Sequence, residues 1–366
     1  MGGPRIVICG AGVIGASVAR ALARRGAPPL VVDRRGTAAA ASGKASGFLA
    51  LDWSAGTPLD AISRAGFALH RELADELGAD RIGHRPTDAL MTAAADAEDL
   101  ERYRRLPNPA WLDGNVVAHE VIGGPGTTAQ VNPRAFTEAV MEDAVAHGAE
   151  LRTGVVDGLR FAGDGAVRAV SVDGREEPAD VVVLALGPWT DRAQRWLALP
   201  QVLGTRMASA VLAADLPAQV VFSEFLAADG RRVTFRIYPR AGGAVYVTGH
   251  PEHGALPDDP ADIVPAPASI AELHRIAGVH ASTLRDAEVV TRTACYRAIT
   301  VDGLPLIGPV PWAPGTFLAT AHGSWGLLTA PATGRMVAEM ILDGGSRSLD
   351  ATPFALTRLP SGRMLA

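Results

Sequence analysis

The sequence predicts an α/β fold that begins with a parallel sheet, and three observations favour it. The apolar run 5–9 leads into glycines at positions 10, 12 and 15 and then into a helix of small and apolar residues. A second apolar run, 30–33, ends in an acidic residue. A third, 181–187, is apolar up to its final glycine, which is typical of a strand buried on both faces.

The glycine-rich turn matches the fingerprint of a dinucleotide-binding βαβ unit. Gly10 permits the tight turn, Gly12 lets the backbone approach a pyrophosphate, and Gly15 lets the helix lie close to the strand. The helix N-terminus offers unpaired N–H groups and the positive end of its dipole to that anion. Asp33 stands where an acidic residue accepts from a ribose hydroxyl, which a surface turn would not explain. The residues predicted to bind the dinucleotide here are Gly10, Gly12, Val13, Ile14, Gly15, Asp33 and Arg34.

Composition narrows the class of protein. The 366 residues carry a formal net charge of −5, so no general basic surface and no nucleic-acid partner are expected. Cys9 and Cys295 form no metal motif and no disulfide framework, which suits a reducing cytoplasm. The first apolar run is interrupted by glycines, unlike a signal peptide, and no apolar segment is long enough to span a bilayer. We therefore expect a two-domain cytoplasmic protein without a metal site.

Further helices follow from apolar spacing and from capping residues. Asn132 is the expected N-cap of a helix that has Pro133 in its first turn and continues to His147. Pro107 and Pro109 are expected to stop another helix. The predicted helices after the first one span 58–77, 96–105, 133–147, 270–277 and 332–342.

Strands and loops fill the remaining segments. The runs 150–156, 158–161 and 167–172 predict a small meander joined by Gly/Asp turns. Further strands are expected at 233–238, 244–248 and 317–321. The small and polar residues 37–46 and the proline-rich residues 257–268 predict loops.

Six sequence blocks, in order, resemble the D-amino acid oxidase superfamily of flavin enzymes, particularly its glycine oxidase and sarcosine oxidase branch. They are residues 10–15, 41–44, 130–133, 184–189, 300–308 and 322–334, and they span nearly the whole chain. The resemblance implies FAD as cofactor and a Rossmann-like FAD-binding domain made of residues 1–50, 128–205 and 290–366. It also implies an α+β substrate domain with a large, mainly antiparallel sheet, made of residues 51–127 and 206–289.

The same resemblance adds residues to the expected cofactor site. Backbone N–H groups of the segment 322–326, which precedes a helix, are expected to face the pyrimidine carbonyl of the flavin, where a reduced flavin carries negative charge. The residues implied to contact FAD beyond the glycine-rich turn are Ser42, Gly43, Lys44, Val156, Gly187, Trp189, Cys295, His322, Gly323, Ser324, Trp325 and Gly326.

Cys295 stands where sarcosine oxidases carry a cysteine bound covalently to the flavin, so the resemblance implies a thioether at this position. The alternative is a buried, apolar cysteine, which is the usual environment of a free one. Cys9 lies inside the first strand and is expected in the core.

Two side chains are implied to act on the substrate, and a third residue, His322, is implied to adjoin the flavin. Arg297 corresponds to the arginine that binds a substrate carboxylate in glycine oxidase-like enzymes, and a guanidinium matches that group bidentately. A structural ion pair is the alternative for Arg297. His250 falls near the active-site histidine of sarcosine oxidases, although a histidine at a strand end is also commonly structural. His322 is expected to act mainly through its backbone.

Two positions depart from the sarcosine oxidase pattern. The lysine that promotes reaction with oxygen is replaced by Tyr246, and the lysine that helps to hold substrate is replaced by Trp325. These changes argue against N-methylglycine as substrate and against fast oxidase behaviour. Trp325 and Tyr296 predict an aromatic pocket for a larger or less polar amine.

The expected reaction is hydride transfer from the carbon next to an amine to flavin N5, giving an imine, with oxygen reoxidising the flavin to release hydrogen peroxide. Two enzymatic alternatives stay open: a dehydrogenase that passes electrons to a quinone or carrier, and a biosynthetic oxidase of a cyclic amine or thiazoline. A third alternative is an FAD-bound structural or trafficking protein. The expected partners are a small amine and an electron acceptor, with the chain a monomer or a small homo-oligomer.

Overall fold

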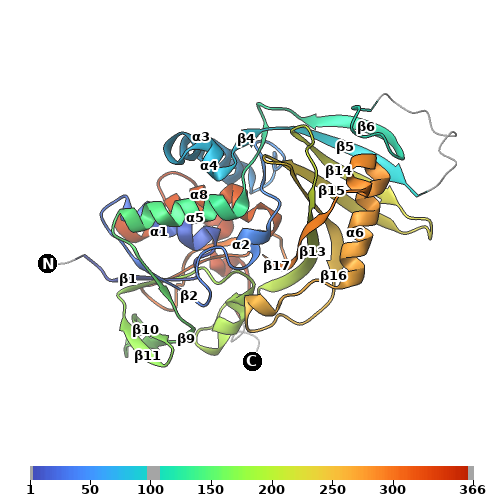
Figure 1. Cartoon of the computed structure of the whole chain (residues 1–366). Coiled ribbons are helices and arrows are strands. Elements are labelled where there is room, and N and C mark those ends of the chain that lie inside the picture. The colour runs from blue at the N-terminus through green and yellow to red at the C-terminus, as the bar shows by residue number, and fades with distance from the viewer. Residues whose placement is uncertain (1–2, 97–107, 362–366) are drawn as a thin grey trace.

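A computed structural model describes residues 3–96 and 108–361. Within them the chain is organised around a six-stranded and a seven-stranded sheet, with helices packed on one face of each (Figure 1). The mixed α/β fold predicted from the sequence is confirmed.

The six-stranded sheet contains the glycine-rich turn. Its strands are parallel except for the antiparallel pair at one edge. In spatial order they are β18 (Leu306–Pro309), β19 (Thr316–Thr320), β12 (Val181–Leu184), β1 (Ile6–Cys9), β2 (Leu30–Asp33) and β8 (Glu150–Thr153).

Both faces of this sheet are covered, as its continuous apolar strands predict. Ile6 and Ile8 of β1 belong to a core shared with three helices: α1 (Val13–Ala23), α5 (Pro133–Ala146) and α8 (Gly326–Asp343). Val7 and Cys9 point to the opposite face and join a core with a smaller three-stranded sheet. The strands of that sheet are β11 (Arg175–Pro178), β10 (Val167–Val172) and β9 (Val156–Phe161).

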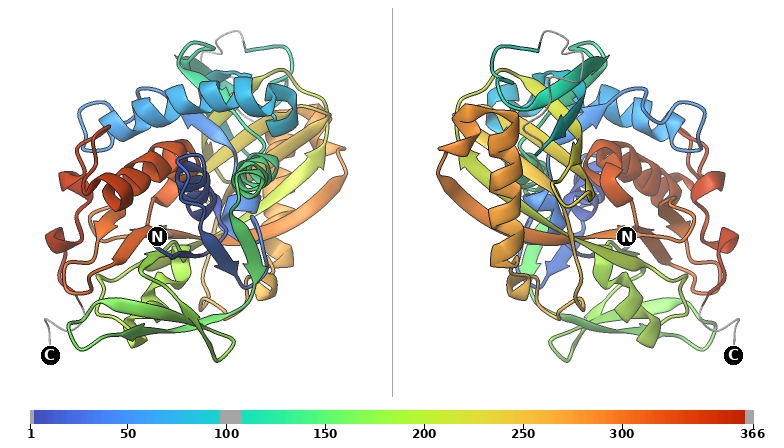
Figure 2. Two further views of the ribbon diagram at one scale, coloured as in Figure 1. Left: turned by 90° about the vertical axis from the view of Figure 1, so that its left-hand side faces the viewer. Right: turned by 90° about the vertical axis from the view of Figure 1, so that its right-hand side faces the viewer.

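The seven-stranded sheet is antiparallel except where β14 pairs with β5. Its spatial order is β17 (Val289–Ile299), β13 (Leu203–Ala213), β16 (Ala244–Glu252), β15 (Arg232–Arg240), β14 (Gln219–Leu226), β5 (Asp88–Ala95) and β6 (Val116–Gly123). Helix α6 (Pro267–His280) covers one face of it (Figure 2).

Short elements connect these layers. A third small sheet has the order β3 (Phe48–Ala50), β7 (Thr128–Gln130) and β4 (Arg85–Pro86). The remaining helices are α2 (Ala41–Lys44), α3 (Asp60–Leu77), α4 (Ala79–Ile82) and α7 (Ser282–Arg285), with 3-10 helices at Gly187–Arg195, Pro260–Asp262, Gly323–Trp325, Thr352–Phe354 and Leu356–Arg358.

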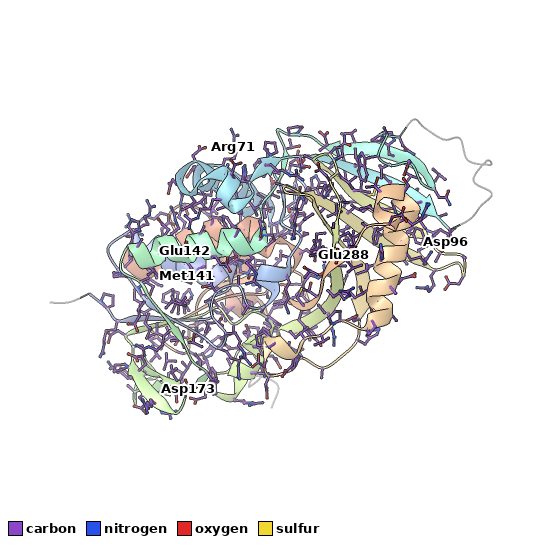
Figure 3. The ribbon with its side chains drawn as sticks, viewed as in Figure 1. Arg71, Asp96, Met141, Glu142, Asp173 and Glu288 are labelled. Atoms are coloured by element: carbon purple, nitrogen blue, oxygen red, sulfur yellow. The ribbon has the colours of Figure 1, made fainter. Side chains whose placement is uncertain are left out.

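Helix α5 begins as its sequence predicts. The Asn132 side chain accepts a hydrogen bond from the Ala135 N–H at 3.2 Å, and Pro133 occupies the first turn. The neighbouring residues Met141 and Glu142 illustrate the two sides of the helix (Figure 3). Met141 is buried in the helical core, whereas Glu142 is exposed and pairs with Arg81. The amphipathic pattern thus fixes which side of α5 packs on the sheet.

Helix α8 begins six residues before its expected start at 332, and Pro331 lies inside it. Proline has no N–H, so the Leu327 carbonyl loses its helical donor. The structure supplies a replacement, because the buried His70 Nε2 on α3 donates to the Leu327 oxygen at 2.9 Å. A tertiary contact therefore lets the helix continue through a residue that normally ends one.

Other expectations need correction. Residues 41–44 form the helical turn α2 inside the expected loop, and β8 joins the six-stranded sheet through β2 instead of the predicted meander. The predicted helix 96–105 falls almost entirely outside the described residues. Strand β17 is part of the seven-stranded sheet, although the predicted boundary at 290 assigns it to the FAD-binding domain, and α3 packs with the core of α1 and α8. The domain division itself remains a prediction.

Two buried histidines make folding stability sensitive to acid. Burial lowers the pKa of His70 and of His280 to about 4, whereas a histidine in the unfolded chain titrates near 6.5. Between these values the unfolded state binds more protons, so stability falls as the pH drops from about 6.5 toward 4. The expected loss at pH 5 is about 2 kcal/mol per histidine, measured by denaturant unfolding at pH 7.5 and 5. The control is His253→Asn, which changes an exposed histidine that has no recorded hydrogen bond or ion pair among the described residues. An unfolding free energy that does not change between pH 7.5 and 5 would contradict the lowered pKa values of these two histidines.

Candidate functional site

A cavity of about 890 Å³ lies between the carboxyl ends of the parallel strands and one face of the seven-stranded sheet. Its lining includes Gly10 and Gly12 after β1, Asp33 at the end of β2, and Gly187 after β12. Ligands of open α/β sheets bind at this edge. The seven-stranded sheet supplies the facing wall.

The glycine-rich turn has the packing that the sequence predicts. Gly10 has a φ of +112°, and a Cβ there would lie 2.4 Å from the Ala185 oxygen. A Cβ on Gly15 would lie 1.9 Å from the Gly10 oxygen, so only glycine lets α1 approach β1 this closely. Gly15 therefore acts behind the cavity and does not line it.

The N-terminus of α1 opens into the cavity. Gly12, Val13 and Ile14 line it, and the Val13 N–H donates to Ser42 Oγ at 2.9 Å. Ser42, which also lines the cavity, therefore ties the short helix α2 to the start of α1. The positive end of the α1 dipole and its first N–H groups favour an anionic group at this point.

Asp33 is held firmly by backbone N–H groups. One carboxylate oxygen accepts from Ala11 at 2.8 Å, and the other accepts from Arg35 at 2.8 Å and from Gly36 at 3.0 Å. A carboxylate has further lone pairs, so Asp33 can still accept from a hydroxyl of a bound ribose. Arg34 lines the same end of the cavity.

The opposite end of the cavity is formed around the start of α8. His322 is buried there, its Nε2 lies 3.1 Å from Thr333 Oγ1, and burial lowers its pKa to about 3. Gly323, Ser324, Trp325 and Gly326 follow in the lining. The His322 imidazole is therefore neutral at ordinary pH and does not act as a positively charged acid.

Of the other expected cofactor contacts, Val156, Gly187, Trp189 and Cys295 line the cavity. The Trp189 indole N–H donates to the Pro257 oxygen at 2.8 Å, which fixes the ring. Gly43 and Lys44 lie behind the lining. A Cβ on Gly43 would lie 2.1 Å from the Ala38 oxygen, so this glycine is required for packing.

Strand alternation decides which side chains of the seven-stranded sheet reach the cavity. One set packs under α6, including Phe235, Ile237, Val245 and Val247. The alternate set faces the cavity. These cavity-facing residues are Met207, Phe222, Arg236, Tyr238, Tyr246, Thr248, Cys295 and Arg297.

Arg297 reaches the cavity from β17 with spare hydrogen-bonding capacity. Its Nη1 donates to Ser324 Oγ at 2.7 Å, and its buried Nε has no partner among the residues described. Burial lowers the pKa of Arg297, and the nearby Arg236 charge lowers it further. The structure records no ion pair for Arg297 within residues 3–96 and 108–361, which argues against the structural ion pair considered above.

Cys295 and Tyr246 lie beside Lys44. The Tyr246 hydroxyl donates to the Lys44 oxygen at 3.0 Å, and Lys44 Nζ donates to the Ala294 oxygen at 3.2 Å. Burial raises the pKa of the Cys295 thiol, and the charges of Lys44 and Arg297 oppose that rise. Burial also lowers the pKa of Lys44.

Sequence reasoning missed several residues of the cavity, among them Trp53, Phe222, Arg236 and Tyr238. Trp53 stacks edge-on against Trp325, with ring centroids 6.3 Å apart, and packs on Phe222 at 4.8 Å. The alternation of residues 232–240 marks Arg236 and Tyr238 as sharing one face, but not which face is buried. The aromatic wall beside Trp325 is therefore formed by Trp53 and Phe222. Tyr296 does not join it, because it packs with Trp189 and Leu256 and its hydroxyl donates to the Ala255 oxygen at 2.9 Å.

His250 lies on β16 opposite Ala208. Its side chain falls outside what the structure describes, so its role stays a prediction. In the described part of the chain, no cluster of three or more His, Cys, Asp or Glu side chains is arranged to hold a metal ion. No helix there is both long and apolar enough to cross a membrane.

The cavity fits FAD in several respects. Gly12 leaves its backbone open beside the α1 N-terminus, which suits a pyrophosphate, and Asp33 suits the adjoining ribose. The far end, from His322 to Leu327, offers a loop and a helix start beside an apolar wall. The residues present therefore match a group with an anionic centre, a ribose and a flat ring system.

Comparison with known proteins agrees with this fit. Residues 5–340 match the family described as "FAD dependent oxidoreductase", abbreviated DAO. A putative oxidoreductase of Schizosaccharomyces pombe is 31% identical over 376 residues, which cover 94% of this chain and 95% of that protein. A glycine oxidase of Pseudomonas aeruginosa is 28% identical over 389 residues, covering 98% and 99% of the two chains.

A solved structure shows the same architecture. The crystal structure of glycine oxidase from Geobacillus kaustophilus superposes with a TM-score of 0.80 at 26% identity, covering 98% of this chain and 99% of that one. Together with the glycine-rich turn, the parallel sheet and the cavity at its carboxyl edge, these matches show that the chain belongs to the DAO family of FAD-dependent oxidoreductases, in its glycine oxidase-like branch.

Proposed function

We propose that this protein oxidises an amine or amino acid at the carbon that bears the nitrogen, giving an imine. The observation that carries the proposal is Arg297, a partly buried guanidinium in the cavity. Among residues 3–96 and 108–361, its only hydrogen-bond partner is Ser324. Free N–H groups in this planar arrangement match a carboxylate bidentately. The glycine oxidases among its relatives support the same class of substrate.

FAD would be held by the glycine-rich turn, Asp33 and the segment 322–326, and it would supply the group that accepts a hydride from the substrate, with oxygen as the final acceptor and hydrogen peroxide as the by-product. The chain's own residues bind and shield the substrate. Arg297 orients its carboxylate, while Trp53, Phe222 and Trp325 form an apolar wall that excludes water. Holding the reacting carbon in one orientation lowers the activation barrier of the oxidation through positioning alone.

No side chain of the sheet wall is suited to remove a proton as a carboxylate base. Among the described residues that the seven-stranded sheet contributes to the cavity, none is acidic. His322 is held neutral and lies beside Thr333. A substrate amine that binds in its neutral form needs no such base, so catalysis rests on positioning and electrostatics.

Anaerobic reduction of the holoenzyme tests this function directly. Carboxylated amines, added without oxygen, are expected to bleach the visible absorption of the bound flavin, because no acceptor is present to restore it. If a broad set of amines and amino acids leaves the absorption unchanged, the proposal is wrong and an FAD-bound structural or trafficking protein is favoured.

The electron acceptor is a separate question, and Tyr246 bears on it. Its hydroxyl is engaged with the Lys44 oxygen, and no lysine charge stands at this position. This favours, as the second candidate, a dehydrogenase that passes electrons to a quinone or carrier. Stopped-flow reoxidation decides between them: rapid recovery of absorption in air supports the oxidase, and very slow recovery supports the dehydrogenase.

The aromatic wall favours one further candidate, an oxidase of a cyclic amine or thiazoline in a biosynthetic pathway. A thiazoline ring is nearly flat and the carbon skeleton of a cyclic amine is apolar, so both suit the tilted rings of Trp53, Phe222 and Trp325. Anaerobic bleaching by cyclic amines but not by open-chain amino acids would favour this candidate over the first.

Covalent attachment of FAD through Cys295 remains a proposal that the cavity lining supports. We expect the yellow colour to stay with the acid-precipitated protein and to pass into the supernatant from a Cys295→Ser variant. Cys9→Ser is the matched control, because that thiol is fully buried in the core and does not line the cavity. If the colour of the unchanged protein passes into the supernatant, FAD is not covalently bound and Cys295 is a packed, unmodified residue.

A further inference from the structure

Two guanidinium groups reach the same wall of the cavity from different strands. Arg236 comes from β15 and Arg297 from β17, and two strands, β13 and β16, lie between them. The charge of Arg236 lowers the pKa of Arg297, so the two positive charges are close enough to repel one another. Both side chains therefore lie on the face of the sheet that lines the cavity, although their strands are separate.

Neither group has a counterion in the part of the chain that the structure describes. Arg297 donates to Ser324, and Arg236 is recorded only against the face of Phe222, with its Cζ 5.8 Å from the ring centroid. Another arginine of the cavity, Arg192, differs because it pairs with Asp258 and donates to the Leu256 oxygen at 2.8 Å.

The sheet supplies no negative charge to either guanidinium group. Burial opposes the charged form of Arg297 and lowers its pKa, Phe222 lies beside Arg236, and the described cavity residues of this sheet include no carboxylate. In such an environment a charge is stabilised only by a partner of opposite sign. A ligand that supplies one carboxylate neutralises one arginine and leaves the other unpaired.

We propose that the substrate is an aminodicarboxylate, an amine that carries two acidic groups. Arg297 binds the carboxylate beside the reacting carbon, and Arg236 binds the second one. The inference rests on the proposed function, because it assigns Arg297 to the first carboxylate. Arg236 is then the residue that determines specificity for the second acidic group.

Paired substrates of equal shape test this assignment. Aspartate is compared with asparagine, and glutamate with glutamine, in both enantiomers, using the holoenzyme and an Arg236→Gln variant. The expected result is a preference of the unchanged protein for the acid, and a fall of roughly tenfold or more in kcat/KM for the acid, but not for the amide, in the variant. Arg232→Gln is the matched control, since Arg232 is exposed on the same strand and lies outside the cavity.

A binding measurement adds a readout that does not depend on turnover. Succinate and malonate, which cannot be oxidised as amines, are expected to perturb the flavin spectrum at lower concentration than acetate does. Arg236→Gln is expected to remove that difference and to leave the response to acetate unchanged. Equal binding of mono- and dicarboxylates by the unchanged protein would overturn the inference.

The outcomes separate this inference from the proposed function. If no amine reduces the flavin, the function itself fails. If amines reduce it but the acid has no advantage over its amide, or if Arg236→Gln weakens acid and amide equally, the function stands and the second carboxylate site is wrong. In the last case both arginines hold a single carboxylate.

Discussion

Replacing Arg297 with alanine is expected to raise KM for carboxylated amines strongly, with kcat/KM falling about 30- to 1000-fold. This corresponds to a loss of about 2–4 kcal/mol, the range for removing one partner of a charged, hydrogen-bonded pair that is shielded from water. Arg297 has only Ser324 as a recorded partner, so its remaining N–H groups are available to the substrate. Steady-state kinetics across carboxylated and uncarboxylated amines measures the effect.

Comparing carboxylated with uncarboxylated amines tests whether Arg297 binds the carboxylate. Binding of the carboxylate is common to the ground state and the transition state, so KM should carry most of the change. Amines without a carboxylate should lose little. A Ser324→Ala control removes the recorded partner but keeps the guanidinium, so it should lose little. An equal loss with carboxylated and uncarboxylated amines in Arg297→Ala would assign Arg297 a structural role. An unchanged KM in Arg297→Ala would remove this residue from the carboxylate site.

Replacing Gly15 with alanine is expected to abolish retention of FAD and to lower stability by about 1–3 kcal/mol or more. The added Cβ would lie 1.9 Å from the Gly10 oxygen and 3.0 Å from its carbon. Both atoms belong to the backbone, so the helix must move away from the strand. That movement would displace the N–H groups of α1 from the cavity.

Two measurements follow this change: the ratio of flavin to protein absorbance after purification, and the thermal midpoint. Gly163→Ala is the matched control, because a Cβ there meets no atom within 4 Å and should leave both values unchanged. A Gly15→Ala protein that keeps its full flavin content and midpoint would show that the close packing of α1 on β1 is not required.

The nucleotide end of the site could be predicted because its information is local. Gly10, Gly12 and Gly15 lie within one turn of chain, and their roles follow from the shape of a strand, a turn and a helix. The Asn132 cap followed in the same way, since its bond to the Ala135 N–H spans three residues. A feature that depends only on residues close together in the sequence can be predicted without the tertiary structure.

The helix α8 shows where such reasoning fails. Pro331 is normally a stop or a start, so the expected helix began at 332. The donor that replaces the missing N–H is His70, which lies far away in sequence on another helix. Likewise, β8 extends the parallel sheet because its partner β2 is free at that edge, not because of its own pattern.

The sequence by itself determined the class of fold and the dinucleotide-binding turn, since these depend on residue types at fixed spacing along the chain, whereas FAD as the cofactor followed from the resemblance to a known family. Only the tertiary structure decided the wall that faces the substrate. Alternation along β15 predicts that Arg236 and Tyr238 share one face of the strand. Because α6 packs on the opposite face, the face with Arg236 and Tyr238 lines the cavity. That Arg236 and Arg297 line the same wall of the cavity depends on the order of the strands in the sheet, which no local pattern encodes.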